Sequence, residues 1–197
     1  MDVVEPWSGK KSVLEKDGTI HSAGDTVLGA DDISGILEIL YGVQLVLDSG
    51  KPHKKIEILF TIGEELYVKG SDVFDYSKVT AKQAYVLDLS EETTFNIGTI
   101  QGGTATNIVP DCCVLTAYET TLESKSVTDF QKACEILGFS GGLTGTFGGS
   151  DNNSFAKNGI EGLVLSNGMY NAHSTREYTT VDDLYKGAEL IGQLILL

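Results

Sequence analysis

The sequence predicts an α/β domain in which helices pack against a mostly parallel sheet. Strand and helix patterns alternate from residue 28 to residue 89, and again from residue 126 to residue 197. Two further strand patterns, within residues 91–123, interrupt this alternation. We therefore expect one core made of residues 1–90 and 124–197, with residues 91–123 as a small two-stranded part beside it.

Composition narrows the class of protein. The chain has 197 residues, of which 41% are hydrophobic and 21% are charged, as in ordinary globular domains. A net charge of -14 argues against nucleic acid as a partner. We expect no membrane span and no signal peptide, because no apolar run reaches about 18 residues and the first residues lack a basic segment. Three cysteines without framework spacing favour the reducing cytoplasm.

Apolar residues at helical spacing predict the helices. Residues 33–49 carry them over so wide an arc that we expect a largely buried helix, with Asp31 and Asp32 capping its N-terminus. A second helix is expected over residues 126–137, where Gly138 ends it. A short helix follows residue 151, and a closing amphipathic helix begins at Thr180.

Short apolar runs predict the strands. Residues 55–62, 84–89 and 163–166 each have an apolar centre, and Lys16–Gly18 has the composition of a hairpin turn. Alternating patterns at residues 93–101 and 112–121 predict two more strands. The core strands are separated by helices, so we expect them to run parallel.

Acidic and imidazole side chains follow these strands and open the first long helix. They are Asp31, Glu64, Glu65, Asp88 and His173. Groups at the carboxyl ends of parallel strands converge, and clustered carboxylates need a cation. Mixed carboxylate and histidine ligands suit zinc, and manganese or cobalt could replace it. Glu64, beside Glu65, could act as a general base. The alternative is solvated surface charge and helix capping, although Asp88 lies within an apolar strand.

Several motifs, in order, resemble the peptidase T-like group of co-catalytic zinc exopeptidases, which are related to aminoacylase and carboxypeptidase G. They are Leu28–Asp32, Glu64–Glu65, Leu87–Asp88, Gly102–Asp111, Gly148–Asp151 and His173–Tyr178. The resemblance implies a three-layer α/β/α catalytic core. It also implies that residues 91–123 are a remnant of the family's lid, or dimerisation, domain.

The resemblance further implies metal ligands. Asp31 would bridge two zinc ions, with Glu65 and His173 completing the first ion's ligands and Asp88 binding the second. The family's remaining ligand, a histidine two residues before Asp2, would fall before Met1, together with the family's first strands. We therefore expect this chain to bind one metal ion well and the second poorly.

The same resemblance implies catalytic and substrate-binding roles. Glu64 would take a proton from water and pass it to the leaving amine, while Asp2 would orient the preceding metal-binding histidine. Asn107 and the backbone of Gly149, Ser150 and Asp151 would help to hold the substrate. By the same resemblance, most of the family's lid domain would be missing, and Ile33 stands where the family has a lysine.

These observations predict a metallo-exopeptidase that removes the N-terminal residue from short peptides. Two alternatives stay open: a carboxypeptidase or amide deacylase of the same family, or an inactive fragment that acts only through binding or assembly. A sheet without its first strands would leave an exposed edge. We therefore expect short peptides as partners, and a homo-oligomer could form through that edge.

Overall fold

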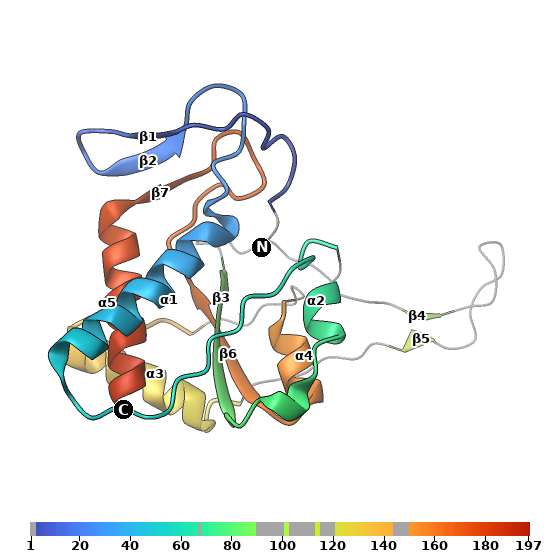
Figure 1. Ribbon diagram of the computed structural model, residues 1–197, viewed down its shortest axis with the longest axis vertical. Helices are drawn as coiled ribbons and strands as arrows, with labels where there is room; N and C mark the ends of the chain where they lie inside the picture. The colour runs from blue at the N-terminus through green and yellow to red at the C-terminus, as the bar shows by residue number, and fades with distance from the viewer. Residues whose placement is uncertain (1–2, 67, 90–100, 103–112, 115–120, 144–149) are drawn as a thin grey trace.

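The computed structural model describes residues 3–66, 68–89, 101–102, 113–114, 121–143 and 150–197, and it has three layers (Figure 1). Strands β3 (Gln83–Leu89) and β6 (Glu161–Ser166) form the middle layer. One face is covered by α1 (Ala30–Ser49), α3 (Lys125–Leu137) and α5 (Val181–Leu196). On the other side lie α2 (Lys69–Asp72) and α4 (Asn152–Lys157). The predicted three-layer α/β/α core is confirmed.

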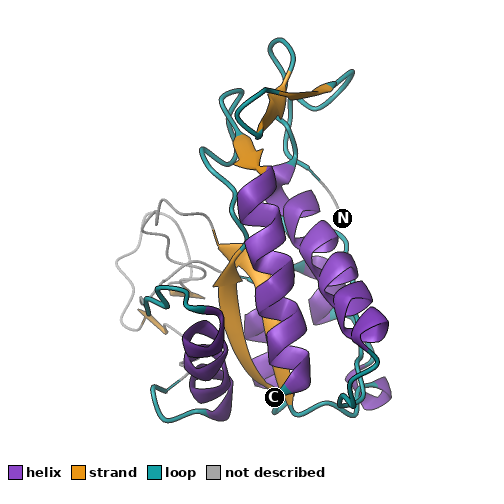
Figure 2. Ribbon diagram, turned by 90° about the vertical axis from the view of Figure 1, so that its left-hand side faces the viewer, coloured by secondary structure: helices purple, strands orange, loops and turns teal. Residues whose placement is uncertain are grey.

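The core lies between β3, β6 and the three longer helices. β3 and β6 run parallel, and Leu87 is paired with Leu165. These two side chains point toward the helices, where they contact Ala133 of α3 and Ile191 and Leu194 of α5. Each large side chain buried in this way stabilises the fold by about 1.5–3 kcal/mol. Figure 2 shows α1 and α5 lying side by side in front of the strands.

A second, antiparallel sheet joins the two ends of the described chain. Its order is β1 (Ser12–Leu14), β2 (Thr19–Ser22) and β7 (Tyr178–Thr180). The predicted turn at Lys16–Gly18 connects β1 and β2 as a hairpin. β7 leads directly into α5, and the Thr180 side chain accepts a hydrogen bond from the Asp183 amide, as its capping pattern predicts.

The prediction that α1 is largely buried was wrong. Leu37 and Leu40 are each 50% exposed. The buried face consists mostly of small or polar residues, with one larger apolar residue, Val46: the others are Ala30, Ser34, Gly35, Glu38 and Gly42. A side chain at position 42 would put its Cβ 2.7 Å from the Ala188 carbonyl oxygen of α5. The two helices pack too closely for large side chains, so the larger apolar residues flank the contact.

The predicted strand at residues 55–62 is also absent. The chain is extended there, yet in the described part of the structure its backbone makes no hydrogen bond to another backbone group. The Glu57 carboxylate holds it in place by accepting from the Thr80 and Ala81 amides, both at 3.0 Å. A strand needs a hydrogen-bonded neighbour, and the edge of β3 does not reach this segment.

The two strands predicted at residues 93–101 and 112–121 lie mostly outside the described residues. In the part that is described, β4 (Gln101–Gly102) pairs with β5 (Cys113–Val114) as an antiparallel two-stranded sheet. This small sheet agrees with the expected two-stranded part. Its assignment to a lid remnant, and the domain division, stay predictions. Among the helices that the structure describes, none has the length and apolar character to cross a membrane.

Glu38 is a buried carboxyl group between α1 and α5. It is 1% exposed, and neither carboxyl oxygen has a hydrogen-bond partner within the described residues. Burial, reinforced by the nearby charge of Asp183, raises its pKa to about 8. Glu38 is therefore protonated in the folded chain at neutral pH.

We predict that Glu38 makes stability fall as the pH rises. Between about pH 5 and pH 8, the folded chain keeps a proton on Glu38 that the unfolded chain releases, so the free energy of unfolding decreases. Glu38→Gln removes this contribution, and near pH 8 it should be more stable than the wild type by about 1–3 kcal/mol. Urea unfolding at several pH values measures the difference. Asp48→Asn, on the exposed side of α1, is the control; parallel curves for wild type and Glu38→Gln would contradict this prediction.

Candidate metal centre

His173 is placed by a short loop that closes on itself. Tyr170 and Tyr178 exchange backbone hydrogen bonds of 2.9 and 3.1 Å, and their rings stack 4.7 Å apart. Between them, the Ser174 hydroxyl donates to the Asn171 carbonyl oxygen at 2.7 Å. His173 itself has a φ of 62°, in the left-handed region. The two tyrosines thus fix the ends of the loop, and the turn within it directs the imidazole toward α1.

Glu65 lies in a tight turn between the extended segment and α2. Gly63, whose φ is 71°, begins this turn, and its carbonyl oxygen accepts from the amides of Leu66 and Lys69. The Glu64 carbonyl oxygen accepts from the Val68 amide at 2.8 Å. A backbone with positive φ favours glycine, because glycine has no Cβ to clash in that conformation. This explains why a glycine, Gly63, precedes the two glutamates.

Asp31 is fixed by a buried carboxylate from the histidine loop. Glu177 is 2% exposed, and its two oxygens accept from the Gly29 amide at 2.6 Å and the Asp31 amide at 2.9 Å. The φ and ψ angles of Asp31 and Asp32 are not helical, and the Asp32 carboxyl group accepts a hydrogen bond from the Gly35 amide, as an N-cap residue does and as predicted. Glu177 binds the amides of Gly29 and Asp31, which leaves the Asp31 carboxylate turned toward His173.

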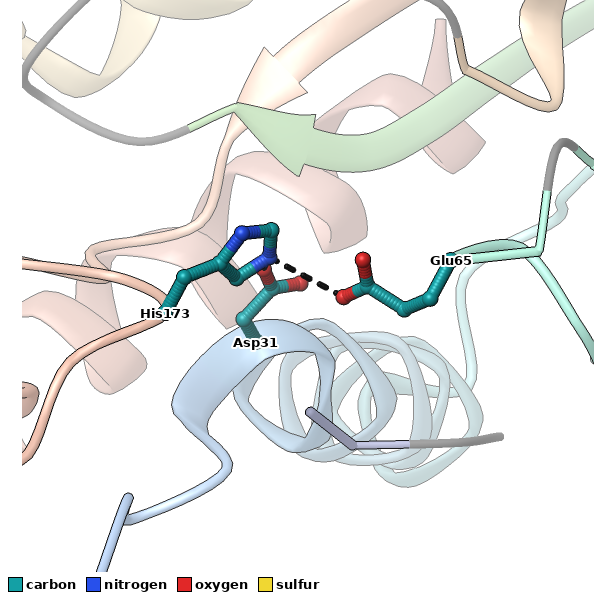
Figure 3. A group of neighbouring side chains, drawn as sticks. All are labelled: Asp31, Glu65 and His173. Atoms are coloured by element: carbon teal, nitrogen blue, oxygen red, sulfur yellow. Dashed lines mark hydrogen bonds and ion pairs between the residues drawn. The ribbon is translucent and has the colours of Figure 1, made fainter. Parts of the chain in front are cut away.

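Three side chains from these segments meet at one point (Figure 3). His173 Nε2 lies 2.8 Å from Asp31 Oδ2 and 3.0 Å from Glu65 Oε1. One potential ligand atom from each residue lies within 4.8 Å of the others. The two carboxylates raise the pKa of His173 to about 10. The structure thus brings together three of the four predicted metal ligands.

The fourth, Asp88, lies at the carboxyl end of β3 and lines the same cavity as Asp31, Glu64 and Glu65. Burial raises its pKa to about 9, and the charges of Glu64 and Asp31 add to the effect. Asp32 also has a pKa of about 9, because it is buried beside Asp31 and Glu38. The cavity therefore concentrates carboxyl groups whose negative charges oppose one another.

This set of donors fits a divalent cation. Two carboxylates and an imidazole are a sufficient protein ligand set for zinc with an open position. Asp151 accepts a hydrogen bond from the Thr61 hydroxyl through Oδ2, but its buried Oδ1 has no partner among the described residues. A cation would offset the repulsion that now keeps protons on Asp88 and Asp32.

The remaining predicted site residues are placed differently. Ser150 is 6% exposed, and its oxygens accept from the Asn152 and Asn153 amides at the start of α4. Asp2, Asn107 and Gly149 lie outside the described residues. Their roles stay predictions.

Sequence reasoning gave no role to two residues that support the site, Glu177 and Asn167. Asn167 is 1% exposed and donates to Asp32 Oδ1 at 2.6 Å and to the Ser34 hydroxyl at 3.0 Å. It follows β6 directly, so the strand-end rule that selected Asp88 applies to it as well. Glu177 lay within a quoted motif, but only the fold reveals its distant backbone partners.

Known proteins resemble this chain over part or nearly all of its length. The sequence profile of peptidase family M20/M25/M40 matches residues 1–197. An uncharacterized protein, YqjE, of Bacillus subtilis (strain 168) is 24% identical over 291 aligned positions, covering 99% of this chain and 78% of that protein. Peptidase T of Vibrio cholerae is 32% identical, but the match covers 60% of this chain and only 28% of the peptidase.

Solved structures share the fold. Aminopeptidase PepT from Bacillus cereus matches with a TM-score of 0.83 and 24% identity, covering 99% of this chain and 78% of that structure. A tripeptidase from Staphylococcus aureus gives 0.82 and 22%, with the same coverage. The three-layer core, the matching structures and the full-length profile agree, and the chain belongs to peptidase family M20/M25/M40.

Proposed function

We propose that this chain is a metal-dependent exopeptidase that hydrolyses the N-terminal peptide bond of short peptides. The observation that carries the proposal is the meeting of Asp31, Glu65 and His173 beside the buried carboxyl group of Asp88. Membership of a peptidase family supports peptide hydrolysis as the reaction. Relatives named peptidase T, aminopeptidase and tripeptidase support an N-terminal cut and a short substrate.

In this proposal, Asp31, Glu65 and His173 hold one metal ion, with zinc as the first candidate. When bound, the ion would make water a stronger nucleophile and polarise the scissile carbonyl group. Asp31 and Asp88 would supply only two ligands for a second ion. A two-ligand site binds weakly in comparison with a three-ligand site, so we expect about one tightly held zinc per chain.

Glu64 acts as the general base in this scheme. It lines the same cavity as Asp88, and its charge raises the pKa of that carboxyl group, so the two groups are near each other. Glu64 would take a proton from the attacking water and return it to the leaving amine. Asp151, also in the cavity, would face the substrate together with Ser150 and the predicted residues Asn107 and Gly149.

The first prediction concerns metal content. Wild-type protein that has been loaded with zinc and desalted should retain about one zinc per chain, and His173→Ala should retain almost none, because two carboxylates are left to bind it. Elemental analysis measures both. His53→Ala, an exposed histidine outside the cluster, should keep the wild-type content. Zinc-free wild type would contradict the site, and two zinc ions would mean that a further group completes the second position.

The second prediction concerns the base. Glu64→Gln should lower kcat on di- and tripeptides by about 10²–10⁴-fold, because proton transfer from water is lost. Its zinc content should stay at the wild-type level, since Glu64 is not a proposed ligand. Glu135→Gln, on the exposed face of α3, is the matched control. Undiminished hydrolysis by Glu64→Gln would refute the mechanism, and a wild type that binds zinc but cuts no peptide would favour a binding role.

The third prediction concerns Glu177 as a positioning residue. Glu177→Gln places an amide group where a carboxylate oxygen now accepts a backbone hydrogen bond. Zinc affinity should fall by about 10–100-fold, because Asp31 loses its fixed orientation. Titration with a competing chelator, at a temperature where circular dichroism shows both proteins folded, separates this effect from unfolding. Arg176→Gln, an exposed neighbour, should bind zinc normally; equal affinity in both variants would restrict Glu177 to a structural role.

A further inference from the structure

A ring of contacts joins α1, α5 and the turn that follows β6. On α1, Ser34 and Glu38 lie one helical turn apart on the same face, and both are buried. Asn167, directly after β6, donates to the Ser34 hydroxyl at 3.0 Å. Glu38 reaches across to α5, where its carboxyl group packs so closely on Gly187 that a Cβ there would lie 2.2 Å from it. Glu38 therefore connects α1 to α5, and a residue larger than glycine at position 187 would displace its carboxyl group.

The ring closes through Asp183 of α5. Asp183 lies one turn before Gly187, on the same face of the helix. A Cβ at Gly168, the residue after Asn167, would lie 2.6 Å from the Asp183 Cβ, so the Asp183 side chain packs directly on this turn. The two helices and the turn thus enclose a small polar region. We call its four polar residues the polar ring: Ser34, Glu38, Asn167 and Asp183.

Buried oxygens of the polar ring lack hydrogen-bond partners. Glu38 and Asn167 are each 1% exposed. Within the described residues, neither carboxyl oxygen of Glu38 has a partner, and the same is true of Oδ1 of Asn167, whose amide nitrogen carries that residue's bonds. Asp183 accepts from the hydroxyls of Tyr170 and Thr180, both through Oδ2. Buried oxygens of this kind cost free energy unless a bound group satisfies them.

Charge decides which kind of group would satisfy these oxygens. The charge of Asp183 raises the pKa of Glu38, and the charge of Glu38 in turn raises the pKa of Asp32. In the described part of the chain, neither Glu38 nor Asp183 forms an ion pair, and Lys186, the lysine of α5, is bonded to the exposed Asp182 at 2.5 Å. A proton on Glu38 satisfies one oxygen at most, whereas a cation attracts every oxygen of the ring.

The donor set favours calcium among the cations. Two carboxylates and an amide oxygen are hard ligands, and calcium binds about six to eight such oxygens, some of them from water. The polar ring contains no imidazole or thiolate, which zinc sites typically include. Magnesium needs a near-ideal octahedron and keeps several waters, which so buried a region does not favour. The negative charges of Glu38 and Asp183 together balance the charge of one calcium ion.

We propose that the polar ring binds one calcium ion through the carboxylates of Glu38 and Asp183 and through Oδ1 of Asn167. The ion replaces the proton that Glu38 otherwise keeps, and it joins α1, α5 and the turn after β6. This site shares no ligand with the candidate metal centre, and it does not depend on peptide hydrolysis. Because Asn167 also bonds to Asp32, bound calcium steadies the start of α1.

Calcium titration of the full chain tests the proposal. The protein is first loaded with zinc and desalted, so that the candidate metal centre is not free to take up calcium. Isothermal titration calorimetry with calcium chloride, near neutral pH, should show about one site per chain with a dissociation constant below about 1 mM. Calcium at about 100 times that constant should raise Tm by about 5 °C or more.

Paired variants locate the ion. Glu38→Gln and Asp183→Asn each remove one charged ligand and keep the shape of the side chain, so each should weaken calcium binding at least about tenfold. The matched controls are Asp48→Asn and Asp182→Asn, on the exposed sides of α1 and α5. Both controls should bind calcium within about twofold of wild type, because their carboxylates lie outside the polar ring. Circular dichroism checks that all four variants are folded.

Three results would overturn the proposal. They are failure of the wild type to bind calcium, wild-type affinity in Glu38→Gln, and calcium binding that is lost in Glu65→Gln but kept in Glu38→Gln. The last result would place the ion at the candidate metal centre. Because the titration measures no hydrolysis, its outcome is independent of whether the proposed peptidase activity is found.

Discussion

The buried carboxylate of Glu177 connects the two parts of the chain from which the metal centre is built. Its loop carries His173, and its oxygens bind the amides of Gly29 and Asp31 at the start of α1. One side chain thus fixes both the imidazole and the carboxylate that faces it. Hydrogen bonds to a buried charge are strong, at about 1.5–3 kcal/mol each. Glu177 lies 148 residues from Gly29 and 146 residues from Asp31 in the sequence. The site therefore forms only when both ends of the domain have folded together.

Electrostatics explains why such anchoring is needed. Asp31, Glu65 and Asp88 are held near one another, and each added negative charge makes the next carboxylate harder to ionise. In this structure, part of the repulsion is relieved by protons on Asp88 and Asp32, and part by His173. Without fixed backbones, the carboxylates would move apart. Asn167, which donates to Asp32, and Glu177, which holds the backbone of Asp31, oppose that movement from beneath the site.

Local pattern was enough to predict much of this fold, but not its closest contacts. The spacing of apolar residues predicted α1, α3 and α5, and the apolar runs predicted β3 and β6. Apolar spacing alone predicted too much burial for α1. The close approach of Gly42 to the backbone of Ala188, which places the larger side chains beside the contact, is a tertiary feature that spacing does not encode. The metal cluster was predicted as a set because strand ends converge. Glu177 was given no role, since a carboxylate that binds distant amides looks in the sequence like any surface acid.

The error at residues 55–62 is informative, because the sequence there is well suited to a strand and lacks only a neighbour. Residues 58–60 are all apolar, and Ile56 and Ile62 extend this apolar centre on either side of Glu57 and Thr61. A strand is nevertheless defined by its partner, and here the next edge is across a cavity. Glu64 and Glu65 follow this segment after Gly63. The bonds of Glu57 to Thr80 and Ala81, and of Thr61 to Asp151, therefore fix the segment that leads to the proposed general base and a proposed metal ligand. The position of this extended backbone thus determines where the two glutamates enter the candidate metal centre.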